Sequence, residues 1–252
     1  METLVDSILR GVLDCLDKDS KLLKGEPPAL NFVRGLEQES SISETKRIEP
    51  EIGYIKVDFF GRRTGTHFQK ALETVVFSDS DPDCNSPKSP FTNRGKRGIK
   101  GLVLDLRDNS GGNLQSALEV LKMFVPPGKT LFIEKTKGGE KPYLSEGGCD
   151  SGGLQLPIVV LINGSTASSA EIVAATLRYH CGAKIVGEKS RGKGTIQEVI
   201  PLGTSTLILT VGEYLLPDGS SLRDKGIVPD LEVKGYEQQL QVAISHFESY
   251  LH

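Results

Sequence analysis

The chain has 252 residues, 37% of them hydrophobic and 25% charged, and a formal net charge of −3 at pH 7. A chain of this length and composition can bury a real core, either as one large domain or as one domain with an appendage. The charge gives no electrostatic reason to expect nucleic acid or an anionic membrane as a partner, and the four cysteines form no CxxC pair, so neither a zinc site nor a dense disulfide framework is indicated.

The first fifty residues are mixed in character. A short helix is predicted around Asp17–Leu23, followed by strands near Leu30–Val33 and Ser40–Thr45. The first thirty residues have neither the basic start nor the apolar stretch of a secretory signal. No apolar run in the chain approaches the ~20 residues that would span a bilayer.

From Ile52 onward the hydrophobic pattern is clearer. Alternation over Tyr54–Phe59 predicts a half-buried strand, and His67–Val76 has the pattern of a helix. Residues 78–97 collect Ser, Asp, Pro, Asn and Gly without periodicity, which indicates a surface loop or insertion.

A unit of strand, turn and amphipathic helix then occurs twice. The first unit is the apolar strand Gly101–Leu106, a turn at Arg107–Asn113 and a helix with Leu114 to Phe124 on one face. The second is the strand Ile158–Ile162, a Gly/Ser turn and a helix carrying Ile172 to Leu177. Continuous apolar strands that alternate with helices predict a layered α/β core. Further strands and a terminal helix are expected at Lys184–Val186, Ile196–Leu202, Leu207–Tyr214 and Tyr236–Leu251.

Ser168 opens the second of these helices, and its pattern has two interpretations. Ser168-x-x-Glu171 before an amphipathic helix is a capping box, in which the serine satisfies free N–H groups of the helix. A serine at a strand-to-helix turn also projects its hydroxyl at the carboxyl end of the strand, beside N–H groups that can bind an anion. The local pattern alone does not decide between helix capping and nucleophilic catalysis.

Lys193 follows a predicted strand and lies between two glycines. An exposed lysine there is usually a solvated charge, but Gly192 and Gly194 would let backbone pack close to the amine. A desolvated lysine can take a proton from a serine hydroxyl. Gln197, four residues on, can orient the lysine or simply lie on an exposed strand face. The histidines suggest no Ser-His-Asp triad; they are His67, His180, His246 and His252.

The same lysine ends a rival pattern. Gly187 to Lys193 matches the G-x-x-x-x-G-K part of a phosphate-binding loop and follows a strand. The next residue is Gly194, where Ser or Thr would hold magnesium, and Thr195–Leu202 has the pattern of a strand where that loop needs a helix. We therefore expect no nucleotide site.

A turn of sequence Asn109-Ser110-Gly111-Gly112 precedes the first of the two helices. Free N–H groups at that position can bind a developing oxyanion. The simpler interpretation is a tight turn that needs glycine for backbone reasons.

Together these segments resemble the C-terminal processing (tail-specific) peptidases, serine proteases with a Ser-Lys catalytic pair. The matching stretches occur in family order at Ile52–Val57, Leu102–Gly112, Pro157–Glu171, Val186–Lys189, Gly192–Gln197 and Asp218–Asp230. The resemblance implies that Ser168 is the nucleophile, Lys193 the general base and Gln197 the residue that orients the lysine. It also implies an oxyanion hole, formed by Gly112 or Gly111 together with the N–H of Ser169, and it implies no metal or other cofactor.

The fold implied by the resemblance is a Clp-protease/crotonase-like layered α/β core with a small β appendage. This peptidase core would occupy residues 49–234, with 78–97 as an inserted loop, and residues 235–252 would form a C-terminal helix. Residues 1–48 resemble only part of a PDZ domain, with Lys18–Gly25 as its second helix and its last strands at Leu30–Gly35 and Glu39–Lys46.

The implied function is endoproteolysis of protein or peptide substrates near their exposed C-termini, without nucleic acid or a membrane span. Family members work in the bacterial periplasm or in the thylakoid lumen of the chloroplast, and no targeting signal in the chain selects a compartment. The alternative is a catalytically silent binding protein of the same fold. A serine-reactive probe distinguishes the two, because a binding protein would leave Ser168 unlabelled.

Overall fold

The structure is a computed structural model, and it describes residues 4–13, 15–24, 40–76, 98–147 and 154–251. Its centre is a six-stranded sheet in the order β11-β8-β7-β4-β3-β2. The strands are β2 (Ile42–Glu49), β3 (Ile52–Val57), β4 (Gly101–Asp105), β7 (Ile158–Ile162), β8 (Lys184–Gly187) and β11 (Leu231–Glu232). All neighbours pair in parallel except β2, which runs antiparallel to β3 at one edge.

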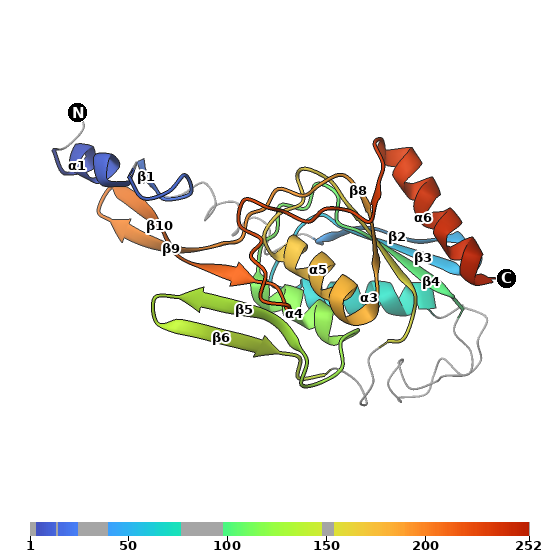
Figure 1. The fold of residues 1–252 in the computed structure, drawn as a ribbon. Coiled ribbons are helices and arrows are strands. Elements are labelled where there is room, and N and C mark those ends of the chain that lie inside the picture. The colour runs from blue at the N-terminus through green and yellow to red at the C-terminus, as the bar shows by residue number, and fades with distance from the viewer. Residues whose placement is uncertain (1–3, 14, 25–39, 77–97, 148–153, 252) are drawn as a thin grey trace.

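Helices cover both faces of this sheet, as Figure 1 shows. One face packs against α3 (Thr64–Val76), α4 (Leu114–Lys122) and α5 (Ser169–Cys181), and the other against α6 (Tyr236–Leu251). Successive side chains of β7 point to opposite faces of the sheet: Val160 belongs to the core under α5, whereas Val159 and Leu161 belong to the core under α6. Every residue of β4 and β7 is buried, which explains their continuous apolar sequences.

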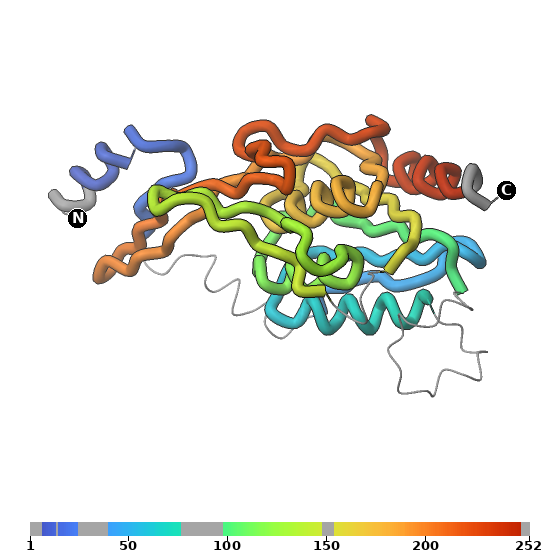
Figure 2. Tube along the Cα trace, turned by 60° about the horizontal axis from the view of Figure 1, so that its bottom comes forward, coloured from blue at the N-terminus to red at the C-terminus, as the bar shows by residue number. Residues whose placement is uncertain are grey.

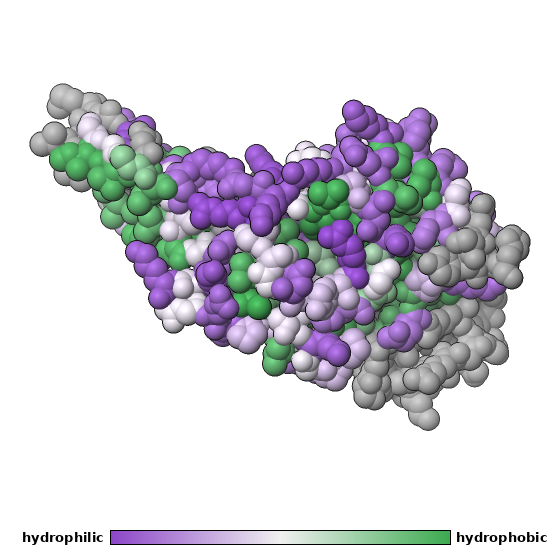
Figure 3. All heavy atoms as spheres, in the orientation of Figure 1, coloured by the Kyte–Doolittle hydropathy of each residue, from purple (hydrophilic) through white to green (hydrophobic). Residues whose placement is uncertain are grey.

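A second sheet forms the β appendage. It contains β1 (Lys21–Lys24), β5 (Thr130–Thr136), β6 (Gly139–Leu144), β9 (Thr195–Leu202) and β10 (Ser205–Leu215), all paired antiparallel. The β9–β10 hairpin projects from the core together with β1 and α1 (Leu4–Leu13), and Figures 1 and 2 both show this arm. Apolar surface lies on the arm in Figure 3, and its exposed apolar side chains include Ile8, Val12 and Leu16.

The predicted layered α/β core is confirmed, and β7 matches its prediction residue for residue. The helix predicted at Asp17–Leu23 is wrong, and so is the PDZ-like helix at Lys18–Gly25, because Lys21–Lys24 is strand β1 on β10. The Asp17 carboxylate accepts the N–H groups of Asp19 and Ser20, both at 2.8 Å, and this local turn replaces the first helical turn.

Two other predictions of the sequence concern residues that the structure does not describe. The strand at Leu30–Val33 lies outside the described residues, as does the insertion at 78–97. The strand near Ser40–Thr45 is found as β2, which pairs with β3 of the central sheet. The partial PDZ likeness of residues 1–48 as a whole stays a prediction. Helix α1 and the β5–β6 hairpin were not predicted.

Candidate active site

Ser168 and the Gly111–Gly112 turn lie at the same edge of the central sheet. Strands β4 and β7 are parallel neighbours, with Leu102 opposite Ile158 and Asp105 opposite Leu161. The loops that leave their carboxyl ends therefore run side by side, which is where open α/β sheets place ligands. One backbone bond joins these loops directly: the N–H of Ala167 donates to the carbonyl of Asn109 at 3.0 Å.

Ser168 is half-buried and has a backbone conformation that is rare outside glycine, with φ 58° and ψ −126°. It is the N-cap of α5, and its carbonyl accepts the N–H of Glu171 at 2.9 Å. Its own N–H donates to the Glu171 carboxylate at 2.8 Å. Strained residues of this kind persist only where surrounding bonds hold them, and they cluster at functional sites.

One carboxylate links the serine to the lysine loop. Glu171 is fully buried, and its Oε2 accepts both the Ser168 N–H at 2.8 Å and the Lys193 N–H at 2.9 Å. The two backbone nitrogens are therefore no farther apart than the sum of these two bonds. Its Oε1 accepts the N–H of Gly192 at 2.7 Å and the hydroxyl of Ser190 at 2.5 Å. Four donors thus compensate a buried carboxylate.

The glycines beside Lys193 allow the close packing that the sequence suggested. A Cβ at Gly192 would lie 2.7 Å from the nitrogen of Gly226, and one at Gly194 would lie 2.6 Å from the nitrogen of Arg223. Lys193 is half-buried, and among the described residues its amine makes no hydrogen bond or ion pair. Thr195–Leu202 forms strand β9, where a phosphate-binding loop would need a helix, so the prediction of a strand is confirmed.

Of the two predicted oxyanion glycines, Gly111 packs against the serine and Gly112 packs against the backbone of Phe60. A Cβ on Gly111 would lie 2.7 Å from Cβ of Ser168, so only glycine fits there, and its φ of 98° also favours glycine. The N–H of Gly111 donates to the Asn109 side chain at 2.8 Å and is thereby occupied. Within the described chain no hydrogen bond is made by the N–H of Gly112 or by that of Ser169, the first residue of α5. Gly112 and Ser169 are therefore the two available donors.

Among the described residues, Gln197 makes no hydrogen bond with Lys193. It lies on β9, where its Nε2 donates to the carbonyl of Asp19 at 2.8 Å. The bond turns the amide nitrogen toward the arm and leaves Oε1 as its remaining polar atom. Its predicted role in orienting the lysine stays a prediction.

A buried ionic network that the sequence did not reveal supports the loop after β4. Asp105 and Arg107 form an ion pair, with exposed fractions of 0% and 3%, and the Tyr54 hydroxyl donates to Asp105 at 2.7 Å. Burial, then the charge of Asp105, raises the pKa of Tyr54 far above its ordinary value, so the hydroxyl keeps its proton. Asp105 and Arg107 are two residues apart at the end of β4, but Tyr54 lies 51 residues away on β3, and no sequence spacing connects it to this pair.

Cysteine, histidine and metal chemistry are less well supported, and Cys181 and His180 lie at the end of α5 opposite Ser168. Burial raises the pKa of Cys181 to about 11, so its thiol is a poor nucleophile at neutral pH. The His180 ring bonds the carbonyl of Thr130 at 2.6 Å, away from Ser168. In the described ranges no cluster of three or more His, Cys, Asp or Glu could hold a metal ion, and no helix there has the length and apolarity to cross a membrane.

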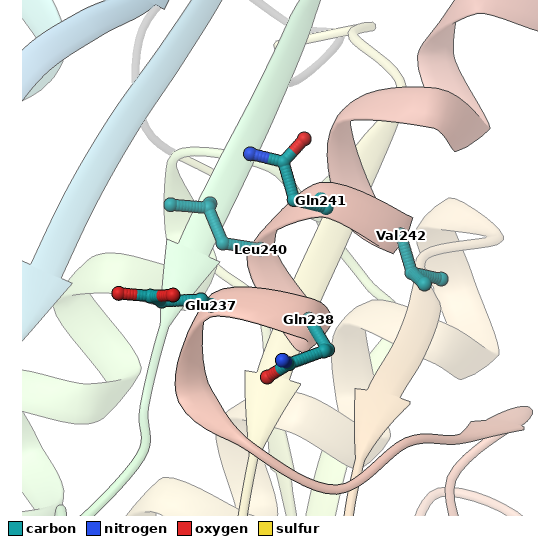
Figure 4. Close-up of a pocket in the computed structure, with 5 residues that line it drawn as sticks. All are labelled: Glu237, Gln238, Leu240, Gln241 and Val242. Atoms are coloured by element: carbon teal, nitrogen blue, oxygen red, sulfur yellow. The ribbon is translucent and has the colours of Figure 1, made fainter.

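A hollow elsewhere on the surface contains none of the predicted site residues. It is bordered by five residues of α6, which Figure 4 shows: Glu237, Gln238, Leu240, Gln241 and Val242. Because α6 packs on the face of the sheet opposite α5, this hollow is separate from the serine.

Comparison with known proteins points to one family. The family model described as Peptidase family S41 matches residues 51–233. The chain is 37% identical over 205 residues to a carboxy-terminal-processing protease of Bartonella bacilliformis, covering 77% of this chain and 43% of that protein. It is 32% identical over 184 residues to a chloroplastic C-terminal processing peptidase of Tetradesmus obliquus, covering 73% and 35%. The chain thus spans less than half the length of these relatives.

Two solved structures share the fold. A lipoprotein from Streptococcus agalactiae aligns with a TM-score of 0.70 at 24% identity, over 97% of this chain and 81% of that one. A photosystem II D1 C-terminal processing protease aligns with a TM-score of 0.59 at 25% identity, over 85% and 47%. The layered core described above is therefore that of known peptidase structures.

Proposed function

Because the chain belongs to peptidase family S41, we propose that it is a serine endopeptidase that cleaves protein substrates near their C-termini through a Ser168–Lys193 pair. The observation that carries the proposal is the single Glu171 oxygen that accepts the N–H groups of both Ser168 and Lys193. This pair of bonds holds the backbones of the proposed nucleophile and base close to each other. The preference for C-terminal tails rests on what the relatives are called.

The first half of the reaction forms an acyl-enzyme. Neutral Lys193 takes the proton of the Ser168 hydroxyl while Oγ attacks the scissile carbonyl carbon. The N–H groups of Gly112 and Ser169 bind the oxyanion that develops. When the tetrahedral intermediate collapses, the C–N bond breaks and the Lys193 ammonium gives its proton to the leaving amine. Gln197 orients the lysine in this scheme.

The second half releases the product. Lys193, neutral again, takes a proton from a water molecule, whose oxygen attacks the acyl carbon. The same two N–H groups bind the second oxyanion, and the Ser168 oxygen leaves with the proton held by Lys193. No metal or nucleotide takes part in either half.

The experiment is cleavage of an unstructured protein with an apolar C-terminal tail. We expect Ser168→Ala and Lys193→Ala to abolish cleavage while circular dichroism shows a native fold. Exposed Ser165 and exposed Lys189, on the same two loops, provide matched controls, and their alanine variants should cleave normally.

A serine-reactive phosphonate gives an independent readout of the nucleophile. Labelling at Ser168, lost in Ser168→Ala, supports the proposal. Full cleavage by either dyad variant would overturn it. A folded chain that neither cleaves nor labels would be the silent binding protein of the alternative interpretation.

A further inference from the structure

The first turn of α6 contacts the loop that carries Gly111 and Gly112, although α6 lies beyond the family match, which ends at residue 233. Nη1 of Arg107 donates a hydrogen bond to the carbonyl of Tyr236 at 2.7 Å and another to Oε1 of Gln239 at 3.1 Å. The Arg107 guanidinium lies over the Tyr236 ring, 4.0 Å from its centre. The helix is thereby fixed to the residue that opens this loop.

The Tyr236 hydroxyl binds Asp108, the residue that follows Arg107. It donates to the carboxylate of Asp108, and the side chain of Asn163 binds the other oxygen of that carboxylate at 2.8 Å. In return the N–H of Asp108 donates to Oδ1 of Asn163 at 3.0 Å. Since Asn163 follows β7, Tyr236 completes a polar link between the loop after β4 and the loop that leads to Ser168.

The conformation of Asp108 determines where the following residues lie. Its φ is 63°, in the left-handed region that glycine adopts freely and aspartate adopts where local hydrogen bonds hold it, as Asn163 and Tyr236 do here. The next residue, Asn109, bonds to both parts of the site: its side chain accepts the N–H of Gly111 at 2.8 Å, and its carbonyl accepts the N–H of Ala167. A relaxed Asp108 would therefore shift Gly111, Gly112 and the residue before the nucleophile together.

We propose that Tyr236 is a positioning residue that, through Asp108, holds the Gly112 N–H in place to bind the oxyanion. It does not touch the substrate, and this inference rests on the proposed peptidase function. The assignment follows from the bonds above and from the partial exposure of Tyr236, a residue that is 45% exposed and so adds little to the core. We therefore expect the hydroxyl to fix the conformation of the loop after β4 and to contribute little to the free energy of unfolding.

The test is Tyr236→Phe, which keeps the ring over Arg107 and removes only the hydroxyl. Tyr179→Phe is the matched control, since Tyr179 is a similarly exposed tyrosine, on α5. Because a displacement of about 1 Å can lower a rate by about 100-fold, we expect the smaller shift here to lower kcat about tenfold and to leave KM within about twofold. The control should keep the wild-type kcat.

A merely structural role predicts a different result: a lower unfolding midpoint with an unchanged kcat per folded molecule, and this result would overturn the proposal. Amide hydrogen exchange supplies a readout that needs no activity, with faster exchange expected in residues 106–113 of Tyr236→Phe and unchanged exchange in β7. Unchanged exchange in both segments would also overturn it. A wild-type chain without cleavage would count against the proposed function, whereas exchange would still decide the role of Tyr236.

Discussion

Replacing Glu171 by glutamine tests whether its carboxylate positions the catalytic pair. A carboxylate presents two acceptor oxygens, and here each receives two donors. An amide presents one oxygen and one NH2 group. In one orientation the NH2 group faces the N–H groups of Ser168 and Lys193, and in the other it faces the N–H of Gly192. The lysine loop therefore loses a bond in either orientation.

The size of the effect follows from the number of unpaired donors. Each buried donor left without an acceptor costs about 1–3 kcal/mol, so one or two of them lower the free energy of unfolding by about 1–6 kcal/mol. Stabilities of folded domains are usually about 5–15 kcal/mol, so a domain in the upper part of that range stays folded after such a loss, and the unfolding measurement shows whether this one does. The rate should suffer more, because release of the loop displaces the base, and a displacement of about 1 Å costs about 100-fold in kcat.

The assay combines urea unfolding with single-turnover cleavage of the tail substrate, using Glu171→Gln and the control Glu188→Gln. Glu188 lies on the same segment after β8, and within the described residues its carboxylate makes no hydrogen bond. We expect the control to match the wild type in both measurements. If Glu171→Gln is destabilised by the expected amount and yet retains the wild-type kcat, the carboxylate serves only to hold α5, and the reasoning is refuted.

Two further predictions concern the glycine turn and the arm. Gly111→Ala should abolish cleavage because its Cβ would lie 2.7 Å from that of Ser168, whereas Gly128→Ala, with φ 79° and no atom within 4 Å, should lose about 1–2 kcal/mol of stability and keep its activity. The pKa of Asp17 is lowered: burial acts to raise it, but hydrogen bonds from Ser20, Asp19 and Thr210 outweigh that effect. The bonds of this carboxylate therefore stabilise the arm above pH 3.8 and are lost as the pH falls through the lower folded pKa. Protection of the β1 amides from exchange, measured relative to the intrinsic exchange rate at each pH, should therefore fall below pH 3.8, and protection that stays constant would contradict this.

The sequence predicts those parts of the fold in which burial alone determines the structure. Strand β7 is apolar at every position because helices cover both of its faces, and its prediction is correct to the residue. The helix predicted at Asp17–Leu23 fails because a local side-chain bond at Asp17 competes with helix formation. The pairing of β1 with β10, for example of Lys21 with Ile208, joins segments far apart in the chain and is decided by tertiary structure.

The same distinction applies to the site. The sequence predicts Ser168, Lys193 and the glycine turn as site residues because each belongs to a short local motif. The structure brings their backbones together. Tyr236 is invisible in the sequence, since it lies 128 residues from Asp108 and no periodicity connects the two. Glu171 is visible only as a helix-capping residue, because a capping box fixes its distance from Ser168 but says nothing of Lys193.

Helix capping and catalysis therefore need not exclude each other at Ser168. The capping-box bond that reaches Glu171 comes from the backbone nitrogen of Ser168, so it does not require the hydroxyl. That bond holds the strained positive-φ conformation of the serine, and the same oxygen also accepts the N–H of Lys193. A carboxylate that only capped a helix could lie at the surface, where water would solvate it; burying it costs several kcal/mol unless polar groups compensate it. The complete burial of Glu171 among four donors, two of them the N–H groups of the proposed nucleophile and base, is the arrangement expected if helix capping is the means by which the pair is positioned.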